Sequence, residues 1–249
     1  MPIRLTKSVK IISILIFVFF LIQKTSDLYL GTQIYSLLSL ESQAFFHRHY
    51  YWQILTYPFL SGDVSQLFFN LLMFVFVGSD LESFWGSRSF LRYLFFCSIS
   101  LGLIYVLSGM GRGVPLVGPS GVLYGLFAAY GLIFGERVLL FMLLFPIQAK
   151  YFALILAAIQ LLTALFSPGV SAVTSFAHFL GMGVGAFYLW GLAKWQISRR
   201  NSSRSFISQL KKLTKKRRSS RKHLKLVVNR LDEIDQADQD SDESPKTWH

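Results

Sequence analysis

The chain has 249 residues, of which 53% are hydrophobic and only 15% are charged. A soluble domain carries about 25% charged residues, so this composition argues against one, and its hydrophobicity excludes disorder of the whole chain. The single cysteine, Cys97, excludes a disulfide framework or a cysteine-ligated metal cluster within one chain.

The positive charge is unevenly distributed. From Lys194 to the end the chain carries 15 Lys and Arg against 7 Asp and Glu, a net charge of +8, whereas the first 193 residues carry 10 against 6, a net charge of +4. A basic excess favours nucleic acid or anionic lipid as a partner. Because this excess lies beside an apolar bulk, we expect the partner to be the lipid bilayer and expect no nucleic acid.

Six apolar segments have the length of membrane-spanning helices, and none shows the alternation of a strand. A bilayer needs about 20 helical residues, although shorter spans occur, and an open sheet cannot span lipid. The sequence therefore predicts an all-α membrane protein with a six-transmembrane-helix bundle. The predicted spans are residues 7–23, 64–79, 90–108, 120–135, 150–166 and 173–193.

The first segment also resembles a signal peptide, since a basic start precedes a short apolar run. Residues 23–27 read Gln-Lys-Thr-Ser-Asp and contain no small-x-small cleavage site. We therefore expect an uncleaved helix.

The loop at about 24–63 is rich in aromatic residues, which suit the headgroup layer of a membrane. These residues are Phe45, Phe46, Tyr50, Tyr51, Trp52, Tyr57 and Phe59. We expect the loop to lie partly embedded as an interfacial element.

A further apolar run, from Val138 to Ile147, contains Pro146 and is too short to span. We predict a helix at this place, lying at or dipping into the interface.

The distribution of Lys and Arg predicts that both termini face the cytosol. One set of loops and ends holds Arg4, Lys7, Lys10, Arg88, Arg92, Arg137, Lys150 and the basic tail, and the opposite set holds only Lys24, Arg48 and Arg112. The protein is thus expected to be multi-pass, in a cell (inner) membrane.

We expect residues 1–196 to form the membrane domain and residues 197–249 a largely disordered cytosolic tail, first basic and then acidic. A basic cluster beside a membrane is attracted to anionic lipid by about 1 kcal/mol per charge, although a merely solvated tail is equally compatible with the composition. Residues 224–234 have the pattern of a short amphipathic helix.

Polar residues inside membrane helices are expensive and mark functional candidates. Those that stand out in the predicted spans are Gln66, Asn70, Ser120, Gln160 and His178. No Asp or Glu lies deep within a span, which weakens an ion-coupled transporter.

Ser120 lies in the sequence Gly118-Pro119-Ser120-Gly121, which leads into an apolar helix. A serine there can cap the helix or simply follow a turn. A catalytic serine would also gain free N–H groups and the positive end of the helix dipole, which suit an oxyanion. The flanking Gly118 and Gly121 would let other backbone come close.

His178 is the only histidine in a predicted span, and a lone buried histidine is more often part of the packing than of a catalytic site. The predicted topology nevertheless gives it the same depth as Ser120. Tyr124, one turn after Ser120, could stack on the imidazole or be an ordinary core residue. Glycines four residues apart would bring the two helices together, although packing alone also explains them. These pairs are Gly121 with Gly125, and Gly181 with Gly185.

Together these motifs resemble the rhomboid family of intramembrane serine proteases. The resemblance rests on Gly-x-Ser-Gly at 118–121 and Ala-His-x-x-Gly-x-x-x-Gly at 177–185, and extends over about residues 7–193. It also includes the aromatic motif at 52–59, Asn70, the segment 81–87 and Gly-Glu-Arg at 135–137.

The resemblance implies a six-helix core and a Ser–His dyad that works without a carboxylate, cofactor or metal. Ser120 would be the nucleophile and His178 the base, with Tyr124 stacked on it and Asn70 contributing to the oxyanion site. The chain departs from the family pattern at three positions: Gln66 replaces the usual histidine of His-x-x-x-Asn, Gln53 follows Trp52 in place of arginine, and Ser61 replaces a histidine. A glutamine amide can donate a hydrogen bond as a histidine can, so Gln66 is expected to assist Asn70.

The resulting hypothesis is an intramembrane serine endopeptidase that cleaves transmembrane segments of membrane proteins. The alternative is a non-catalytic rhomboid-like protein that binds and escorts membrane helices, favoured mildly by Gln53 and Gln66. A small transporter or channel is a third class, disfavoured by the lack of buried carboxylates and of paired half-helices.

Overall fold

The computed structural model describes residues 5–29, 33–109, 113–141 and 145–196, with only the backbone described at 33, 139–141 and 145. The predicted tail at 197–249, including the predicted amphipathic helix at 224–234, lies outside these residues. The chain divides into two compact units, Met1–Gly191 and Leu192–His249. The candidate site described below lies in the first unit.

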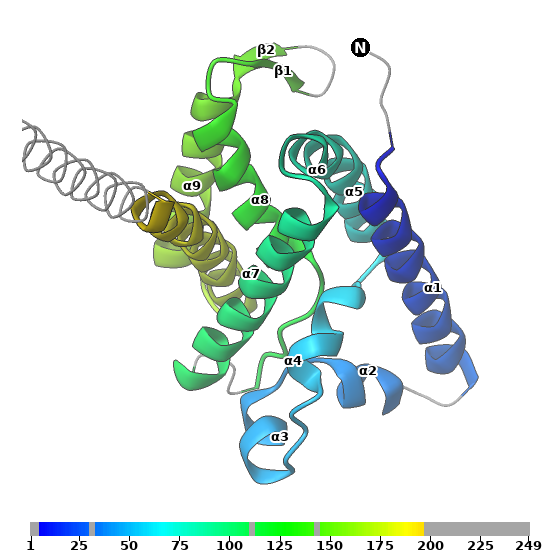
Figure 1. The fold of residues 1–249 in the computed structure, drawn as a ribbon. Coiled ribbons are helices and arrows are strands. Elements are labelled where there is room, and N and C mark those ends of the chain that lie inside the picture. The colour runs from blue at the N-terminus through cyan, green and yellow to red at the C-terminus, as the bar shows by residue number, and fades with distance from the viewer. Residues whose placement is uncertain (1–4, 30–32, 110–112, 142–144, 197–249) are drawn as a thin grey trace, which may run out of the picture. The chain divides into compact units, whose positions relative to one another are not determined.

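Helices make up most of the first unit (Figure 1). In chain order the elements are α1 (Lys7–Tyr29), α2 (Gln33–Leu38), α3 (Ser42–His47), α4 (Gln53–Thr56), the 3₁₀-helix η1 (Tyr57–Phe59), α5 (Val64–Met73), the π-helical turn η2 (Phe74–Gly78), α6 (Ser79–Trp85), α7 (Ser87–Leu107), α8 (Ser120–Ile133), β1 (Val138–Phe141), β2 (Phe145–Gln148) and α9 (Ala149–Phe166). A last helix covers Val170–Gln196.

All six predicted segments are helical, which confirms the all-α membrane fold. Among the described residues, five helices are long and apolar enough to cross a membrane, and α8 is apolar but shorter, with 14 residues. The five are Lys7–Tyr29, Val64–Trp85, Ser87–Leu107, Ala149–Phe166 and Val170–Gln196. The second is longer than predicted, because η2 joins α5 to α6 without a break.

The start of α1 is fixed by a buried carboxylate from α6. Glu82 is only 3% exposed and accepts hydrogen bonds from the backbone N–H groups of Ser8 and Val9, each at 3.0 Å, and from the hydroxyls of Thr6 and Ser87. The first N–H groups of a helix have no partner within the helix, so an outside carboxylate satisfies them. This contact joins the N-terminus of α1 to the turn before α7.

The helix predicted at Val138–Ile147 is wrong, because this run forms the antiparallel hairpin of β1 and β2. The register pairs Val138 with Gln148 and Leu140 with Pro146. Proline lacks the N–H that a helix interior needs, whereas a strand in a two-stranded ribbon tolerates it. The hairpin lies at the end of the bundle opposite α2, α3 and α4 (Figure 1).

The loop between α1 and α5 is folded and attached to the segment before α8. Leu40 and Leu116 form a two-bond antiparallel bridge, with N–O distances of 3.1 and 2.8 Å. The Trp52 indole donates to the Leu37 carbonyl, and the Thr56 hydroxyl donates to the Leu38 carbonyl. These bonds fix α2 and α4 against each other, beside the chain that leads to Ser120.

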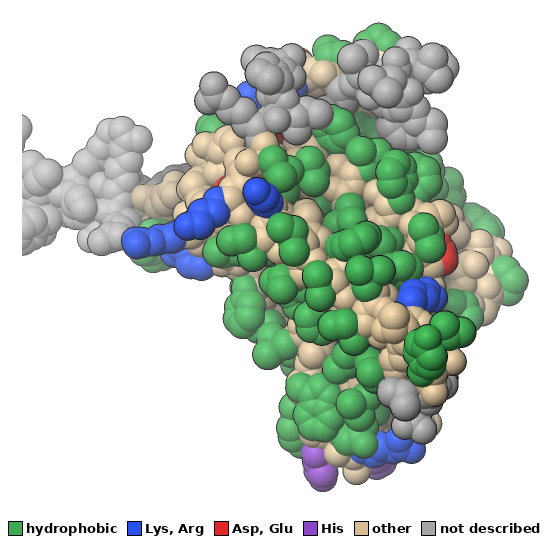
Figure 2. Space-filling view, turned by 90° about the vertical axis from the view of Figure 1, so that its right-hand side faces the viewer, with side chains coloured by type: hydrophobic (Ala, Val, Ile, Leu, Met, Phe, Trp, Pro, Cys, Tyr) green, Lys and Arg blue, Asp and Glu red, His purple; other side chains and the backbone are tan. Residues whose placement is uncertain are grey.

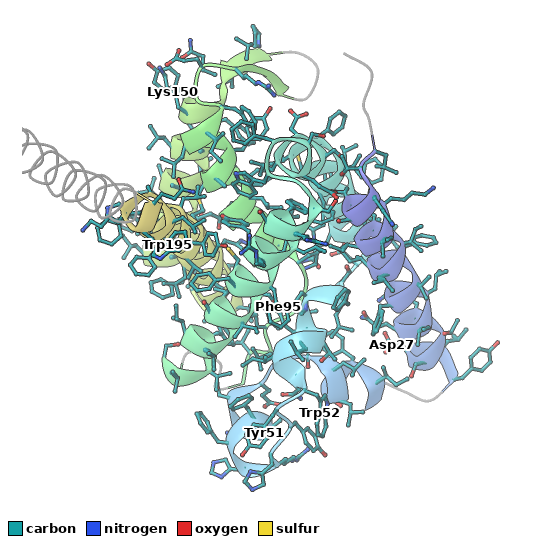
Figure 3. All side chains as sticks on the ribbon, viewed as in Figure 1. Asp27, Tyr51, Trp52, Phe95, Lys150 and Trp195 are labelled. Carbon is teal, nitrogen blue, oxygen red and sulfur yellow. The ribbon has the colours of Figure 1, made fainter. Side chains whose placement is uncertain are left out.

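The surface carries many large hydrophobic side chains, as a protein surrounded by lipid requires. Figure 2 shows them spread over the face that it presents. Phe95 on α7 is 57% exposed and Leu154 on α9 is 64% exposed. In Figure 3, Tyr51 and Trp52 lie at one end of the bundle and Lys150 at the other, so these amphipathic and charged groups lie at its two ends.

Candidate active site

The turn that leads into α8 exposes the N-terminus of this helix. Gly118 has φ of +96°, a conformation that glycine adopts at no steric cost, and its N–H donates to the Tyr57 carbonyl at 2.8 Å. Pro119 follows as the N-cap, and Ser120 is the first residue of the helix. The backbone N–H of Ser120 is therefore among those that the helix itself leaves free.

The Ser120 hydroxyl lies against the imidazole of the last helix. Its Oγ is 2.9 Å from Nε2 of His178, which is hydrogen-bond distance, although the two residues are 58 apart in sequence. Both side chains are half-buried. A serine hydroxyl bonded to a neutral imidazole nitrogen is the arrangement in which the imidazole can remove the hydroxyl proton.

Glycines allow the two helices to approach at this place. A Cβ atom on Gly181 would collide with the backbone carbonyl of Gly121, and one on Gly185 would lie 2.7 Å from the carbonyl oxygen of Gly125. The Tyr93 hydroxyl donates to that same Gly125 oxygen at 2.6 Å, so α7 is bonded to α8 at the contact between α8 and the last helix. Any larger residue at Gly181 would push the last helix away from α8 and the imidazole away from the serine.

The imidazole is held on its other side by two further groups. The Tyr124 ring is stacked on it, with centroids 4.5 Å apart and an interplanar angle of 17°. Gln160 from α9 lies beside both, with its Oε1 3.3 Å from Nδ1 of His178 and its Nε2 donating to the Tyr124 hydroxyl. The structure thus brings Ser120, His178, Tyr124 and Gln160 together from three helices.

The opposite wall comes from the N-terminal part of α5. The Asp63 side chain caps this helix by accepting from the Gln66 N–H at 2.8 Å, and hydrogen bonds from Ser65 and from that N–H lower the pKa of Asp63. The Gln66 amide oxygen accepts from the Gly62 N–H at 2.7 Å. This bond directs the amide nitrogen to the Gly118 side, 3.5 Å from where a Cβ on Gly118 would lie.

Asn70, one turn after Gln66, is only 9% exposed. Its Nδ2 has no hydrogen-bond partner in the part of the chain that the structure describes. A buried donor without a partner costs about 1–3 kcal/mol, so its presence calls for an explanation.

Between the two walls lies a cavity of about 350 Å³. Ser120, His178 and Gln66 line it, together with Tyr35, Gly113–Val117 and Thr174, among others. The segment 113–117 borders the cavity beside the serine, and the backbone of its Leu116 is paired with Leu40.

The comparisons with known proteins identify the family of the chain. The family described as the rhomboid domain matches residues 48–195, which is more than half of the chain. The chain belongs to the rhomboid family. This rhomboid is therefore a multi-pass integral membrane protein in a lipid environment, as the fold and its apolar helices indicate.

Two plant relatives are similar to this rhomboid over parts of their length. RHOMBOID-like protein 1 of Arabidopsis thaliana is 29% identical over 149 residues, covering 56% of this chain and 34% of the relative. RHOMBOID-like protein 2 of the same plant is 32% identical over 97 residues, covering 35% and 27%. The rhomboid chain thus spans about a third or less of the length of these relatives.

All three departures from the family pattern have hydrogen-bond partners in this rhomboid, and that of Gln66 is the Gly62 N–H. Gln53 is fully buried; its amide donates to the Ser36 and Leu37 carbonyls, and its oxygen accepts from the Glu41 N–H. Ser61 is also fully buried, and its backbone forms a two-bond pair with the Gln23 amide. Both residues hold loops that flank the site, and neither lines the cavity.

Sequence reasoning singled out Gln160 as a polar residue in a span but gave it no role. The partners of Gln160 are Tyr124 on α8 and His178 on the last helix. Whether Gln160 reaches them depends on how α9 is rotated about its axis, which the sequence does not give. The Gln23–Ser61 pair was missed altogether. A buried glutamine one turn from the end of an apolar run was the available signal.

Proposed function

We propose that this rhomboid is an intramembrane serine endopeptidase with Ser120 as nucleophile and His178 as base. The observation that carries the proposal is the 2.9 Å contact of Ser120 Oγ with His178 Nε2 at the edge of the cavity. A serine that merely capped its helix would direct its oxygen at backbone N–H groups and would need no imidazole.

In the proposed reaction, His178 Nε2 takes the proton of Ser120 as Oγ attacks the scissile carbonyl carbon. The tetrahedral intermediate carries the resulting negative charge on the former carbonyl oxygen. His178 then gives its proton to the leaving amine, and the carbon–nitrogen bond breaks. Water, deprotonated by the same nitrogen, hydrolyses the acyl-enzyme and releases the free serine.

Three donors are proposed to hold the oxyanion: the Ser120 N–H, the Asn70 amide and the Gln66 amide. The unpaired Nδ2 of Asn70 supports this role, because a donor without a ground-state partner is available for charge that develops later. The Gly62–Gln66 bond supports the role of Gln66, since it leaves the amide nitrogen on the cavity side. Gly118 and Gly121 have no side chains that would block the scissile carbonyl from reaching these donors.

The proposed substrates are transmembrane segments of membrane proteins. A helix hides its carbonyl groups in its own hydrogen bonds, so the segment must unwind before Ser120 can reach a carbonyl. Residues 113–117 line the cavity beside Ser120, where they would border such an extended segment. We expect preference for segments with poor helix formers near the cleaved bond.

The direct test is cleavage of a model single-span substrate in liposomes by wild type and by Ser120→Ala. We expect the variant to lose turnover while it keeps the thermal stability of wild type. Ser171→Ala, which removes an exposed serine near the start of the last helix, is the matched control and should cleave normally. Undiminished turnover by Ser120→Ala would refute the proposal.

The competing function is that of a non-catalytic protein that binds membrane helices. Replacement of histidine by Gln66 at the oxyanion wall is the feature that favours it. A wild type that binds the model substrate, cleaves none and leaves a fluorophosphonate probe unattached would establish that alternative.

The proposed orientation has both termini in the cytosol and the Ser120 end of α8 on the outer side. It rests on the Lys and Arg distribution, and the basic tail would then face anionic cytoplasmic lipid. In a Cys97→Ser background, a cysteine at Gln43, which is exposed, should react with an impermeant maleimide added outside, and one at Ser203 should not. The reverse pattern would overturn the orientation.

A further inference from the structure

We propose that Gln160 is a positioning residue that selects the reactive tautomer of His178. The inference rests on the proposed function, since it assigns to an amide on α9 the part that a carboxylate has in a catalytic triad. It concerns a residue to which the family pattern quoted above gives no role.

Gln160, His178 and Tyr124 each contact the other two. Gln160 Oε1 lies 3.3 Å from His178 Nδ1, Gln160 Nε2 donates to the Tyr124 hydroxyl, and the Tyr124 ring stacks on the imidazole. Among the described residues, Gln160 is the one side chain with a hydrogen bond to Nδ1. His178 is thereby bonded at both nitrogens and covered on one face.

In the structure the Gln160 amide nitrogen faces the Tyr124 hydroxyl and the amide oxygen faces His178 Nδ1. An amide oxygen can only accept a hydrogen bond, so Nδ1 must carry the proton. The lone pair of the neutral imidazole then lies on Nε2, which faces Ser120 at 2.9 Å.

This tautomer is the one that the chemistry requires. With the proton on Nε2 instead, the imidazole could not remove the Ser120 proton. When His178 becomes an imidazolium during the reaction, the Gln160 oxygen also lies at the positive Nδ1–H. A neutral amide stabilises that charge less than a carboxylate does, and it costs less to bury in a membrane.

Gln160 is not placed to bind substrate. It does not line the cavity, and its helix meets the core of the bundle through Leu156, one turn earlier on the same face. A loss caused by its removal should therefore appear in kcat and leave KM unchanged.

The experiment compares Gln160→Leu, which keeps the size and removes both bonds, with Gln160→Glu, which keeps an acceptor for Nδ1. Thr163→Val is the matched control, because the Thr163 hydroxyl bonds only within α9, to the Ile159 carbonyl at 2.8 Å. Two quantities are measured in detergent micelles: kcat and KM, and the tautomer of His178 from nitrogen-15 NMR of the labelled imidazole. His178→Asn identifies the signal.

We expect wild type and Thr163→Val to show a single Nδ1–H tautomer. Gln160→Leu should show a mixture, with kcat lower by about 10- to 100-fold, the range found when the partner that orients a metal-bound histidine is removed. Gln160→Glu should keep the Nδ1–H tautomer and a higher kcat than Gln160→Leu. If Gln160→Leu does not fold, Tyr124→Phe gives the second test, since it removes only the hydroxyl that orients the amide and should also broaden the tautomer distribution.

A Gln160→Leu variant that is folded and keeps both the tautomer and kcat of wild type would overturn the inference and leave the proposed protease intact. A wild type without any cleavage would refute the protease, whereas the NMR signal would still decide the role of Gln160. Equal losses of kcat in the Leu and Glu variants, with the tautomer unchanged in both, would also overturn the positioning role.

Discussion

The two walls of the site differ in how fully their polar groups are paired, and of these groups Ser120, His178 and Gln66 line the cavity whereas Gln160, Tyr124 and Asn70 do not. On the wall built by α8, α9 and the last helix, Ser120, His178, Gln160 and Tyr124 form one connected set of hydrogen bonds. On the wall built by α5, the Asn70 Nδ2 has no partner among the described residues. Gln66 on that wall has its amide oxygen bonded and its nitrogen on the cavity side.

This difference matches what each wall must do in a serine protease. A base must be in one orientation and one tautomer before substrate arrives, which full pairing secures. An oxyanion donor must strengthen its bonds only in the transition state, and a group already paired in the free enzyme would have to break a bond first. The Asn70 Nδ2, which has no partner among the described residues, thus lowers the stability of the fold at a place where the proposed reaction would use a free donor.

The largest effect on the α5 wall is expected from Asn70→Ala. Losing one oxyanion donor typically costs about 10²- to 10³-fold in kcat, and because the Asn70 Nδ2 has no partner among the described residues, stability should hardly fall. Steady-state cleavage of the model substrate measures the first and thermal unfolding the second. Phe69→Ala on the same helix, where Phe69 is 52% exposed, is the control and should keep kcat. A loss of stability without loss of kcat in Asn70→Ala would make Asn70 a packing residue.

A smaller loss is expected from Gln66→Ala, about 10-fold in kcat, which corresponds to one hydrogen bond of about 1.4 kcal/mol. Gln66 is half-buried, so water can take over part of its role. KM should change less than kcat, since the bond strengthens in the transition state.

Gln66→His sharpens the comparison by restoring the residue usual in the family. A gain in kcat would show that the α5 wall of this chain is weakened relative to its relatives. If Gln66→Ala keeps full kcat, Gln66 is structural and serves only to bond Gly62.

The clearest effect on stability is expected from Gly181→Ala, which should also lower kcat because it moves His178 away from Ser120. The added Cβ would meet the backbone of Gly121, which cannot rotate away as a side chain can. Overpacking of this kind costs about 1–3 kcal/mol of unfolding free energy. Gly183→Ala is the matched control, because nothing lies within 4 Å of a Cβ there. Equal thermal midpoints of the two variants would show that α8 and the last helix are not in close contact.

Hydropathy predicted where the spans lie because lipid requires long apolar helices, and α1, α7 and α9 begin within three residues of the expected places. It failed at Val138–Ile147, since a short apolar run has no periodicity that separates a helix from a strand. It also ended the second span too early. The polar residues of α6, including Glu82, resembled a loop, whereas Glu82 is buried by capping α1.

The residues of the site that have a signal in their local sequence could be predicted. Ser120 follows a glycine turn, His178 shares a helix with spaced glycines, and Tyr124 lies one turn after Ser120, so each was named from its own surroundings. Gln160 could not be given a role, because its partners depend on how α9 is rotated against α8. Likewise, the pairing state of Asn70 and Gln66 depends on atoms contributed by other segments.

The central claim, that His178 activates Ser120, is tested most directly by locating the adduct of a fluorophosphonate probe by mass spectrometry. We expect wild type in liposomes to carry one adduct, on Ser120, and His178→Ala to carry none on the same timescale. Because the two residues act as a unit, Ser120→Ala and the double variant should be equally unreactive. Labelling of Ser120 in His178→Ala at the rate of wild type would contradict the account.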